Sequence, residues 1–230
     1  MEDILARGTL PVIVGGTGLY IDSLLSGRTF AGGEVNDALR QELSERYDEI
    51  GAAGLLGELR KVDPARAEKL HPGDKKRIVR ALEVFILTGK TITQHDEETR
   101  AIPPRWESAK IALDFENRQE LYDRIDRRVD DMFARGLMDE VRALLQSGVS
   151  DRCTAMQAIG YKEAAAALRG ECSEEEARAL IQQESRRYAK RQLTWFRRDR
   201  EIEWHRFGSI PDLNEALQHS TAFLRSRGIE

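Results

Sequence analysis

The residues with the clearest chemical potential form a glycine-rich turn near the start of the chain. Gly15, Gly16 and Gly18 surround Thr17 and follow a short apolar run at residues 10–14 (LPVIV), which predicts a buried parallel strand and then a tight turn. Glycines after such a strand let backbone N–H groups approach an anion, and the next helix adds its dipole. A strand-to-helix turn without a ligand explains these residues equally well.

Three arginines, Arg124, Arg127 and Arg128, lie on a helix predicted over residues 117–135. Arg124 and Arg128 are four residues apart and share a face. A guanidinium that points into a cleft suits a diphosphate, which favours bidentate contacts. The alternative is a solvated face whose acidic partners are Asp123, Asp126, Asp130 and Asp131.

A basic segment follows between Arg186 and Arg200, with seven Lys or Arg residues and one acid. Aromatic side chains lie between these charges. In such a combination the cations bind phosphates along a nucleic-acid strand and the rings stack on bases, and the stacking contributes about 1–3 kcal/mol per base. A solvated basic face, with Trp195 and Phe196 in the core, is the alternative; we prefer the core for Phe196. The density of positive charge favours RNA.

The composition excludes several classes of protein. The chain has 230 residues and a net charge of −4, yet it contains a second basic segment at residues 74–80 (DKKRIVR). An acidic protein with local basic segments fits a partner that binds only at those segments. No apolar run is long enough for a membrane helix. The two cysteines lack metal-ligand spacing and indicate a reducing cytoplasm, and the four scattered histidines disfavour a zinc site.

Hydrophobic periodicity predicts an α/β core interrupted by helices. Residues 36–89 form an all-helical block with three apolar stripes, the last of which includes Ile86, and Gly89 ends it. Residues 90–108 suggest a polar connection. The remaining predictions are helices at 1–8, 18–26, 117–135 (capping box Asn117 and Glu120), 138–146, from Ser173 (capping box with Glu176) and 212–227, and strands at 110–115 and 201–207.

Two further motifs carry little weight alone. Residues 157–162 (QAIGYK) predict a turn at Gly160 beside a ring and a cation, which a plain interhelical corner also explains. Residues 87–91 (LTGKT) contain Gly-Lys-Thr but lack the first glycine of a phosphate loop and end a helix. The chain contains no Walker A sequence, catalytic triad, catalytic cysteine setting or metal cage.

Taken together, five collinear segments resemble the bacterial tRNA dimethylallyltransferases, the isopentenyl-tRNA transferase or IPP transferase family. The resemblance covers residues 2 to about 205, and its order is more specific than any one motif. The segments are PVIVGGTGLYIDSLL, KVDPARAEKLHPGDKKRIVRALEVFILTGK, LYDRIDRRVDDMFARGLMDEVRALL, MQAIGYKE and AKRQLTWFRRD.

The resemblance implies transfer of a dimethylallyl group from dimethylallyl diphosphate to the exocyclic N6 amine of an adenosine. That adenosine lies 3′ to the anticodon in tRNAs reading codons that begin with U. The implied fold is a P-loop NTPase-like core with a parallel sheet, at residues 1–33 and 101–230, plus a helical insertion at 34–100 that contacts the anticodon stem-loop. Mg²⁺ accompanies the diphosphate, and we expect a cytoplasmic monomer with no membrane contact.

The resemblance also assigns site residues. Thr17 would face the target nucleotide and Arg128 would reach the diphosphate, both as catalytic residues, with Gly15 and Gly16 as further phosphate ligands. Besides Thr17, the implied tRNA contacts are Arg40, Lys76, Arg77, Ile78, Val79, Arg80, Gln157, Ala158, Ile159, Gly160, Tyr161, Lys162, Lys190, Arg191, Gln192, Thr194, Trp195 and Arg197.

The sequence departs from the family pattern at its beginning. The phosphate loop with Lys-Thr/Ser and the Asp that serves as base are both expected upstream of Met1, so we expect a chain truncated before the P-loop. Its first strands would then be missing, and the chain alone would give no product with donor and tRNA.

Three other functions are compatible with parts of the sequence. An adenylate isopentenyltransferase would use a free nucleotide, but a small acceptor needs neither the helical insertion nor the basic segment. A non-catalytic tRNA-binding remnant would bind tRNA with salt sensitivity and would not bind diphosphate. A P-loop kinase or ATPase is disfavoured, because no Walker B signature is found.

Overall fold

Two units make up the chain in the computed structural model, Met1–Ser108 and Ala109–Glu230. The structure describes residues 1–27, 36–151 and 153–229. The predicted division into a core and an insertion remains a prediction, and its first boundary, at residues 33/34, lies outside the described residues.

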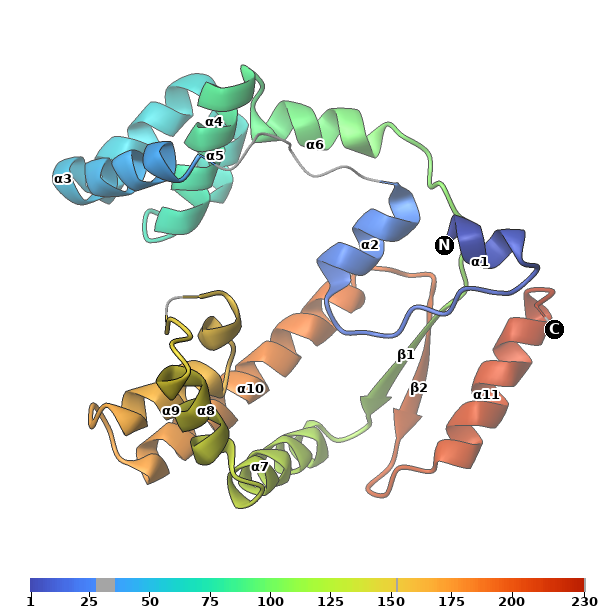
Figure 1. The fold of residues 1–230 in the computed structure, drawn as a ribbon. Coiled ribbons are helices and arrows are strands. Elements are labelled where there is room, and N and C mark those ends of the chain that lie inside the picture. The colour runs from blue at the N-terminus through green and yellow to red at the C-terminus, as the bar shows by residue number, and fades with distance from the viewer. Residues whose placement is uncertain (28–35, 152, 230) are drawn as a thin grey trace. The chain divides into compact units, whose positions relative to one another are not determined.

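The first unit is built on the predicted helical block, in which α5 packs along α3 (Figure 1). Its core side chains include Leu55, Leu59 and Ile78, none of which has any exposed surface. A glycine with positive φ, Gly51, breaks α3, and Gly89 ends α5 in the left-handed conformation. The helices of the block are α3 (Asp37–Val62), α4 (Pro64–Lys69) and α5 (Lys75–Thr88).

A buried carboxylate joins the block to one more helix, α6 (Ile92–Arg100). Asp63 caps α4 and also accepts hydrogen bonds from the Thr93 amide (3.1 Å) and hydroxyl (2.6 Å). The prediction of a polar connection over residues 90–108 was therefore wrong for half of that range. Thr91 and Gln94 form a capping box, which starts a helix despite the polar sequence.

The amino-terminal segment contains the predicted helices but not the predicted strand. Helices α1 (Glu2–Ala6) and α2 (Gly18–Ser26) form, whereas residues 10–14 form no strand, and Val12 and Val14 are 79% and 91% exposed. A parallel strand needs a hydrogen-bonded neighbour, and the two strands that the structure describes pair only with each other. An apolar sequence at residues 10–14 was therefore not sufficient to form a strand.

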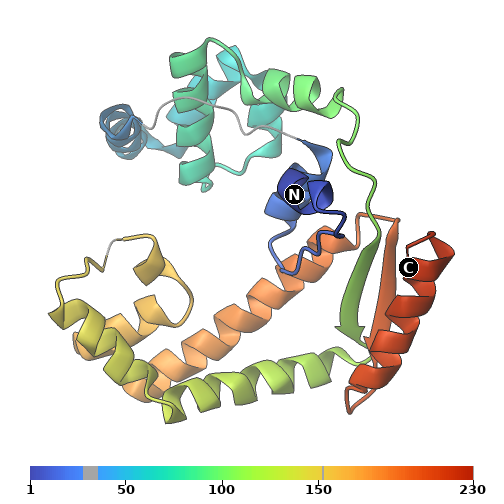
Figure 2. The ribbon, with the colours of Figure 1, turned by 45° about the vertical axis from the view of Figure 1, so that its right-hand side comes forward.

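The second unit contains both remaining predicted strands, β1 (Lys110–Phe115) and β2 (Ile202–Phe207), as a parallel pair. Lys110 aligns with Ile202, and the register continues to Phe115 and Phe207. Parallel strands require a crossover, here made by α7 to α10, after which α11 packs on β2 (Figures 1 and 2). These elements are α7 (Arg118–Ala134), α8 (Leu137–Gln146), the 3₁₀ turn Ala155–Gln157, α9 (Tyr161–Leu168), α10 (Glu174–Phe196) and α11 (Leu213–Ser226).

The crossover helices enclose a second core that includes Val129, Val141, Met156 and Ile181. The predicted capping box at Ser173 and Glu176 opens α10. The box predicted at Asn117 and Glu120 was wrong, because the Asn117 side chain accepts from the Gln119 amide instead. The parallel sheet and the helical block confirm the predicted fold class. No helix in the described residues has the length and apolar character needed to cross a membrane.

Shortening a side chain in the first core should destabilise the chain by about 2–5 kcal/mol. Leu59→Ala removes a side chain with no exposed surface, whereas Ile86, which the predicted stripe wrongly placed on the buried face, is 55% exposed. Urea unfolding of both variants tests the assignment. Ile86→Ala should change the free energy of unfolding by less than about 0.5 kcal/mol, and equal losses for the two variants would contradict the core described above.

Candidate functional site

Thr17 lies exposed at the amino terminus of α2, as the sequence predicted. Its carbonyl oxygen accepts from the Tyr20 and Ile21 amides, whereas its side chain caps nothing in the helix. Neither Gly15 nor Gly16 has a positive φ, and the chain bends at Gly16 before α2 begins. The space around Gly15 is open within 4 Å of a Cβ position, which leaves the backbone there accessible.

Arg128 lies on an exposed face of α7, and its charge is not neutralised by the acids that surround it in sequence. Asp126 pairs with Arg186 of α10, and Asp130 lies 3.7 Å from Arg178. Among the described residues, no hydrogen bond or ion pair is formed by the side chains of Arg124, Arg127 or Arg128. The three arginines are exposed, as the alternative of a solvated face expected, but Asp126 and Asp130, two of the four acids expected as their partners, pair with α10 instead.

The basic segment covers the end of α10 and the residues just after it, and it exposes cations beside rings. The Arg191 guanidinium lies 5.7 Å from the Tyr188 ring centre, and that of Arg198 lies 5.9 Å from Trp195. Lys190 is exposed, and Trp195 is 36% exposed. Rings held beside guanidiniums provide both a stacking platform and charge for a single-stranded nucleic acid.

Arg197, at the carboxyl-terminal end of α10, is tied to the sheet. Its Nη2 lies 3.0 Å from a carboxylate oxygen of Asp114, which is 6% exposed near the end of β1. The other oxygen of Asp114 accepts from the Phe115 amide. Gln192 is half-buried, whereas Lys190, Arg191, Thr194, Trp195 and Arg197 are exposed, and the Thr194 hydroxyl donates to the Lys190 carbonyl.

The predicted turn at residues 157–162 forms around Gly160, whose φ of 108° and ψ of −54° suit only glycine. Its amide donates to the buried Glu163 carboxylate (2.8 Å), and Lys162 lies 3.3 Å from the same group. The Tyr161 hydroxyl donates to Glu140, and this bond, with burial, raises the pKa of the phenol. Of the predicted contacts here, Gln157, Ala158 and Lys162 are exposed, Ile159 and Tyr161 are half-buried and Gly160 is buried.

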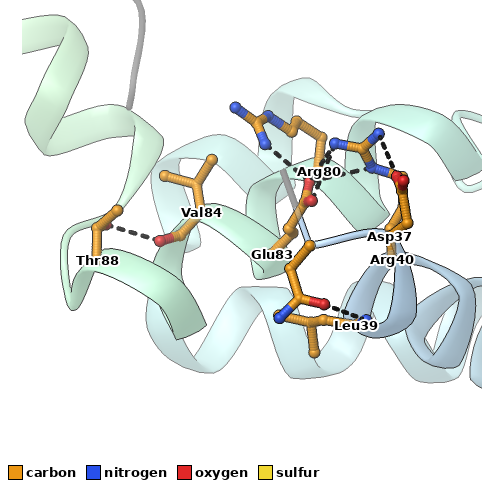
Figure 3. A network of polar contacts seen from close by, with 8 residues as sticks. Asp37, Leu39, Arg40, Arg80, Glu83, Val84 and Thr88 are labelled. Carbon is orange, nitrogen blue, oxygen red and sulfur yellow. Dashed lines mark hydrogen bonds and ion pairs between the residues drawn. The ribbon is translucent and has the colours of Figure 1, made fainter. Parts of the chain in front are cut away.

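In the first unit the structure brings together two of the predicted basic residues. Arg40 of α3 and Arg80 of α5 converge on Glu83, which has no exposed surface (Figure 3). Burial raises the pKa of Glu83, but the hydrogen bonds and charges of the two arginines lower it below its ordinary value. Lys76 and Arg77 are exposed, whereas the Ile78 and Val79 side chains are in the core and are not accessible to a partner.

A dedicated metal cage is not found in the described part of the chain. No group of three or more His, Cys, Asp or Glu side chains lies there in positions that could hold a metal ion.

Sequence reasoning missed the acids that position these basic groups. Glu83 stands three residues after Arg80 inside an apolar stripe, and a charge at a core position was the signal that could have found it. Glu163 stands three residues after Gly160, at capping-box spacing. Asp114 gave no signal, because its partner lies far away in the sequence.

An α/β sheet with a helical bundle and separate basic surfaces has the features of an enzyme class that acts on nucleic acid. The family model described as IPP transferase matches residues 1–199, and the chain belongs to that family. The tRNA dimethylallyltransferase of Geobacter sulfurreducens is 50% identical over 89% of this chain, which spans 65% of that relative's length. The enzyme of Acetivibrio thermocellus, also named tRNA dimethylallyltransferase, is 39% identical over the whole chain, which spans 73% of it.

Solved structures agree with the sequence relatives. The tRNA isopentenylpyrophosphate transferase of Bacillus halodurans matches 99% of this chain, and 71% of its own length, with 35% identity and a TM-score of 0.63. A eukaryotic dimethylallyltransferase acting on tRNA matches 96% of this chain, and 56% of its own length, with 26% identity and a TM-score of 0.71. The fold is therefore that of the family.

Replacing Gly160 should destabilise the second unit, because alanine is strained at this φ and ψ by about 1–3 kcal/mol. A Cβ there would also lie 3.4 Å from Met132 Cε. Gly170→Ala is the matched control, since Gly170 also has a positive φ (77°) but has open space around it. Chemical denaturation should show the larger loss for Gly160→Ala, and a larger loss for Gly170→Ala would show that the turn is not packed as described.

Proposed function

We propose that this protein is a tRNA dimethylallyltransferase that modifies the adenosine 3′-adjacent to the anticodon in tRNAs reading codons that begin with U. The donor would be dimethylallyl diphosphate. The family membership supports the reaction. The observation that carries the RNA assignment lies at the carboxyl-terminal end of α10, where Arg191 lies beside Tyr188, and Arg198, just after the helix, lies beside Trp195.

The chemistry requires an exposed base and a stabilised leaving group. The adenine leaves its stack, its N6 forms a bond to C1 of the allyl group, and the C1–O bond breaks. Diphosphate departs with that electron pair, while N6 loses a proton to a base that we assign to no described residue. Negative charge develops on the diphosphate, so a cation that is not already neutralised is best suited to stabilise it.

Arg128 is the cation that we propose stabilises the departing diphosphate, and Thr17 is the residue that we propose contacts the acceptor nucleotide. Arg128 is exposed and, among the described residues, pairs with no acid. Thr17, two residues after the accessible backbone at Gly15, would contact the target nucleotide. The proposal includes Mg²⁺ as the companion of the diphosphate and assigns it no ligand in this chain.

The proposal also includes a monomer that acts in the cytoplasm, where tRNA is found. The free thiols of Cys153 and Cys172 support a reducing compartment.

Binding of a tRNA anticodon stem-loop at several salt concentrations tests the RNA surface. Lys190→Ala should weaken binding and reduce the slope of log K against log salt by roughly 0.7–0.9, the loss of one phosphate contact. Arg225→Ala on α11, which also removes an exposed cation, should leave the slope unchanged. Equal effects of both variants would reduce the proposal to a general charge effect, and displacement of the RNA by adenosine monophosphate would favour an adenylate isopentenyltransferase.

Binding of inorganic diphosphate tests the role of Arg128. Arg128→Ala should lower the affinity by roughly 10- to 100-fold, the value of a charge-assisted hydrogen bond. Arg127→Ala is the matched control, because Arg127 is the neighbouring exposed arginine on the same helix and is likewise unpaired among the described residues. Isothermal titration calorimetry of both variants decides the assignment, and an unchanged affinity in Arg128→Ala would exclude it.

A further inference from the structure

We propose that Glu83 is a positioning residue that holds Arg40 and Arg80 in a fixed orientation toward RNA phosphates. The inference rests on the proposed function, because it assigns a role within the tRNA-binding surface of the first unit. Glu83 does not itself face the RNA, since its side chain is fully buried.

The geometry is that of one carboxylate shared by two guanidiniums. Nη2 of Arg40 lies 2.9 Å from one oxygen of Glu83 and 3.2 Å from the other, and its Nε lies 3.4 Å from the second oxygen. Nη1 of Arg80 lies 2.8 Å from that second oxygen. The two arginines come from different helices, α3 and α5, and Figure 3 shows both converging on the carboxylate.

Packing of the two helices does not require this arrangement. Leu43, Leu55 and Ile78 already fill the space between α3 and α5. A buried ion pair contributes little net stability compared with an apolar residue of similar volume, because the charges lose their hydration. Net stability therefore does not explain why a carboxylate is buried at this position.

The exposure of the arginines supplies a reason. Although their partner is fully buried, the Arg40 and Arg80 side chains remain 44% and 38% exposed. Glu83, together with Asp37, which lies 3.8 Å from Nη1 of Arg40, offsets part of this positive charge, and exposed Lys76 and Arg77 on the first turn of α5 add further cations beside the two guanidiniums. Guanidiniums fixed in advance lose less conformational freedom when they bind phosphate.

Because Glu83 is negatively charged, the direction of the change in RNA affinity distinguishes a Coulomb effect from a loss of orientation. Glu83→Gln keeps the size of the side chain and removes one negative charge, so a simple Coulomb effect would strengthen binding to RNA. Loss of orientation would weaken it. Glu68→Gln is the matched control, because it removes the charge of an exposed glutamate on α4 in the same unit and leaves the two arginines in place.

The experiment measures binding of an anticodon stem-loop to the intact chain across a salt series. We expect Glu83→Gln to bind roughly tenfold more weakly, with a salt slope shallower by roughly one to two, as the loss of up to two phosphate contacts would require. Glu68→Gln should bind as tightly as the wild type or slightly more tightly. Tighter binding or an unchanged slope in Glu83→Gln would overturn the inference.

A second pair of variants keeps the test decisive if Glu83→Gln does not fold. Arg40→Lys and Arg80→Lys keep the positive charges and the buried acid but remove the planar fork that Glu83 orients. Each should weaken binding while circular dichroism shows a folded chain, and wild-type affinity in both would refute the positioning role. A wild-type chain that binds no stem-loop would instead refute the proposed function, and the inference with it.

Discussion

Removing a carboxylate from water costs several kcal/mol unless hydrogen-bond donors replace its hydration. The described part of the chain meets this constraint at junctions between its elements. Asp63 joins α4 to α6, Glu83 joins α3 to α5, Asp114 joins β1 to the end of α10, and Glu163 holds the turn before α9. Each buried acid fixes a place where two segments meet, and at Glu83, Asp114 and Glu163 the donors include residues of the proposed surfaces.

The same constraint sorts the basic residues into two groups. Arg40, Arg80 and Arg197 are held by buried acids, which fixes their directions. Arg128 and Lys190 are exposed and have no acid partner among the described residues, which leaves their full charge for an anion. Composition alone does not reveal this division, because a chain with a net charge of −4 still presents local surfaces that are positive.

Local sequence predicted the elements that local forces determine. The strands at residues 110–115 and 201–207, the cap at Ser173 and the turn at Gly160 follow from periodicity, capping chemistry and glycine. The strand at residues 10–14 failed, because strand formation requires a partner that an apolar pattern does not supply.

Ion pairs between residues far apart in the chain could not be predicted from the sequence either. Asp126 and Asp130 were candidates to pair with arginines of their own helix, but they bind α10 instead. Asp114 and Glu83 find partners far along the chain, so their roles are visible only in the folded structure. Basic residues of the candidate site could be predicted from their types and spacing, whereas the acids that orient them could not.

The crossover between the two strands has a consequence for how the protein folds. Lys110 pairs with Ile202, so the entire run of α7 to α10 lies between the two halves of the sheet. The entropy of closing that long loop must be met before any strand hydrogen bond contributes, which makes such pairing slow. The helices can form by local contacts, and we therefore expect the sheet, with its Asp114–Arg197 pair, to close after them.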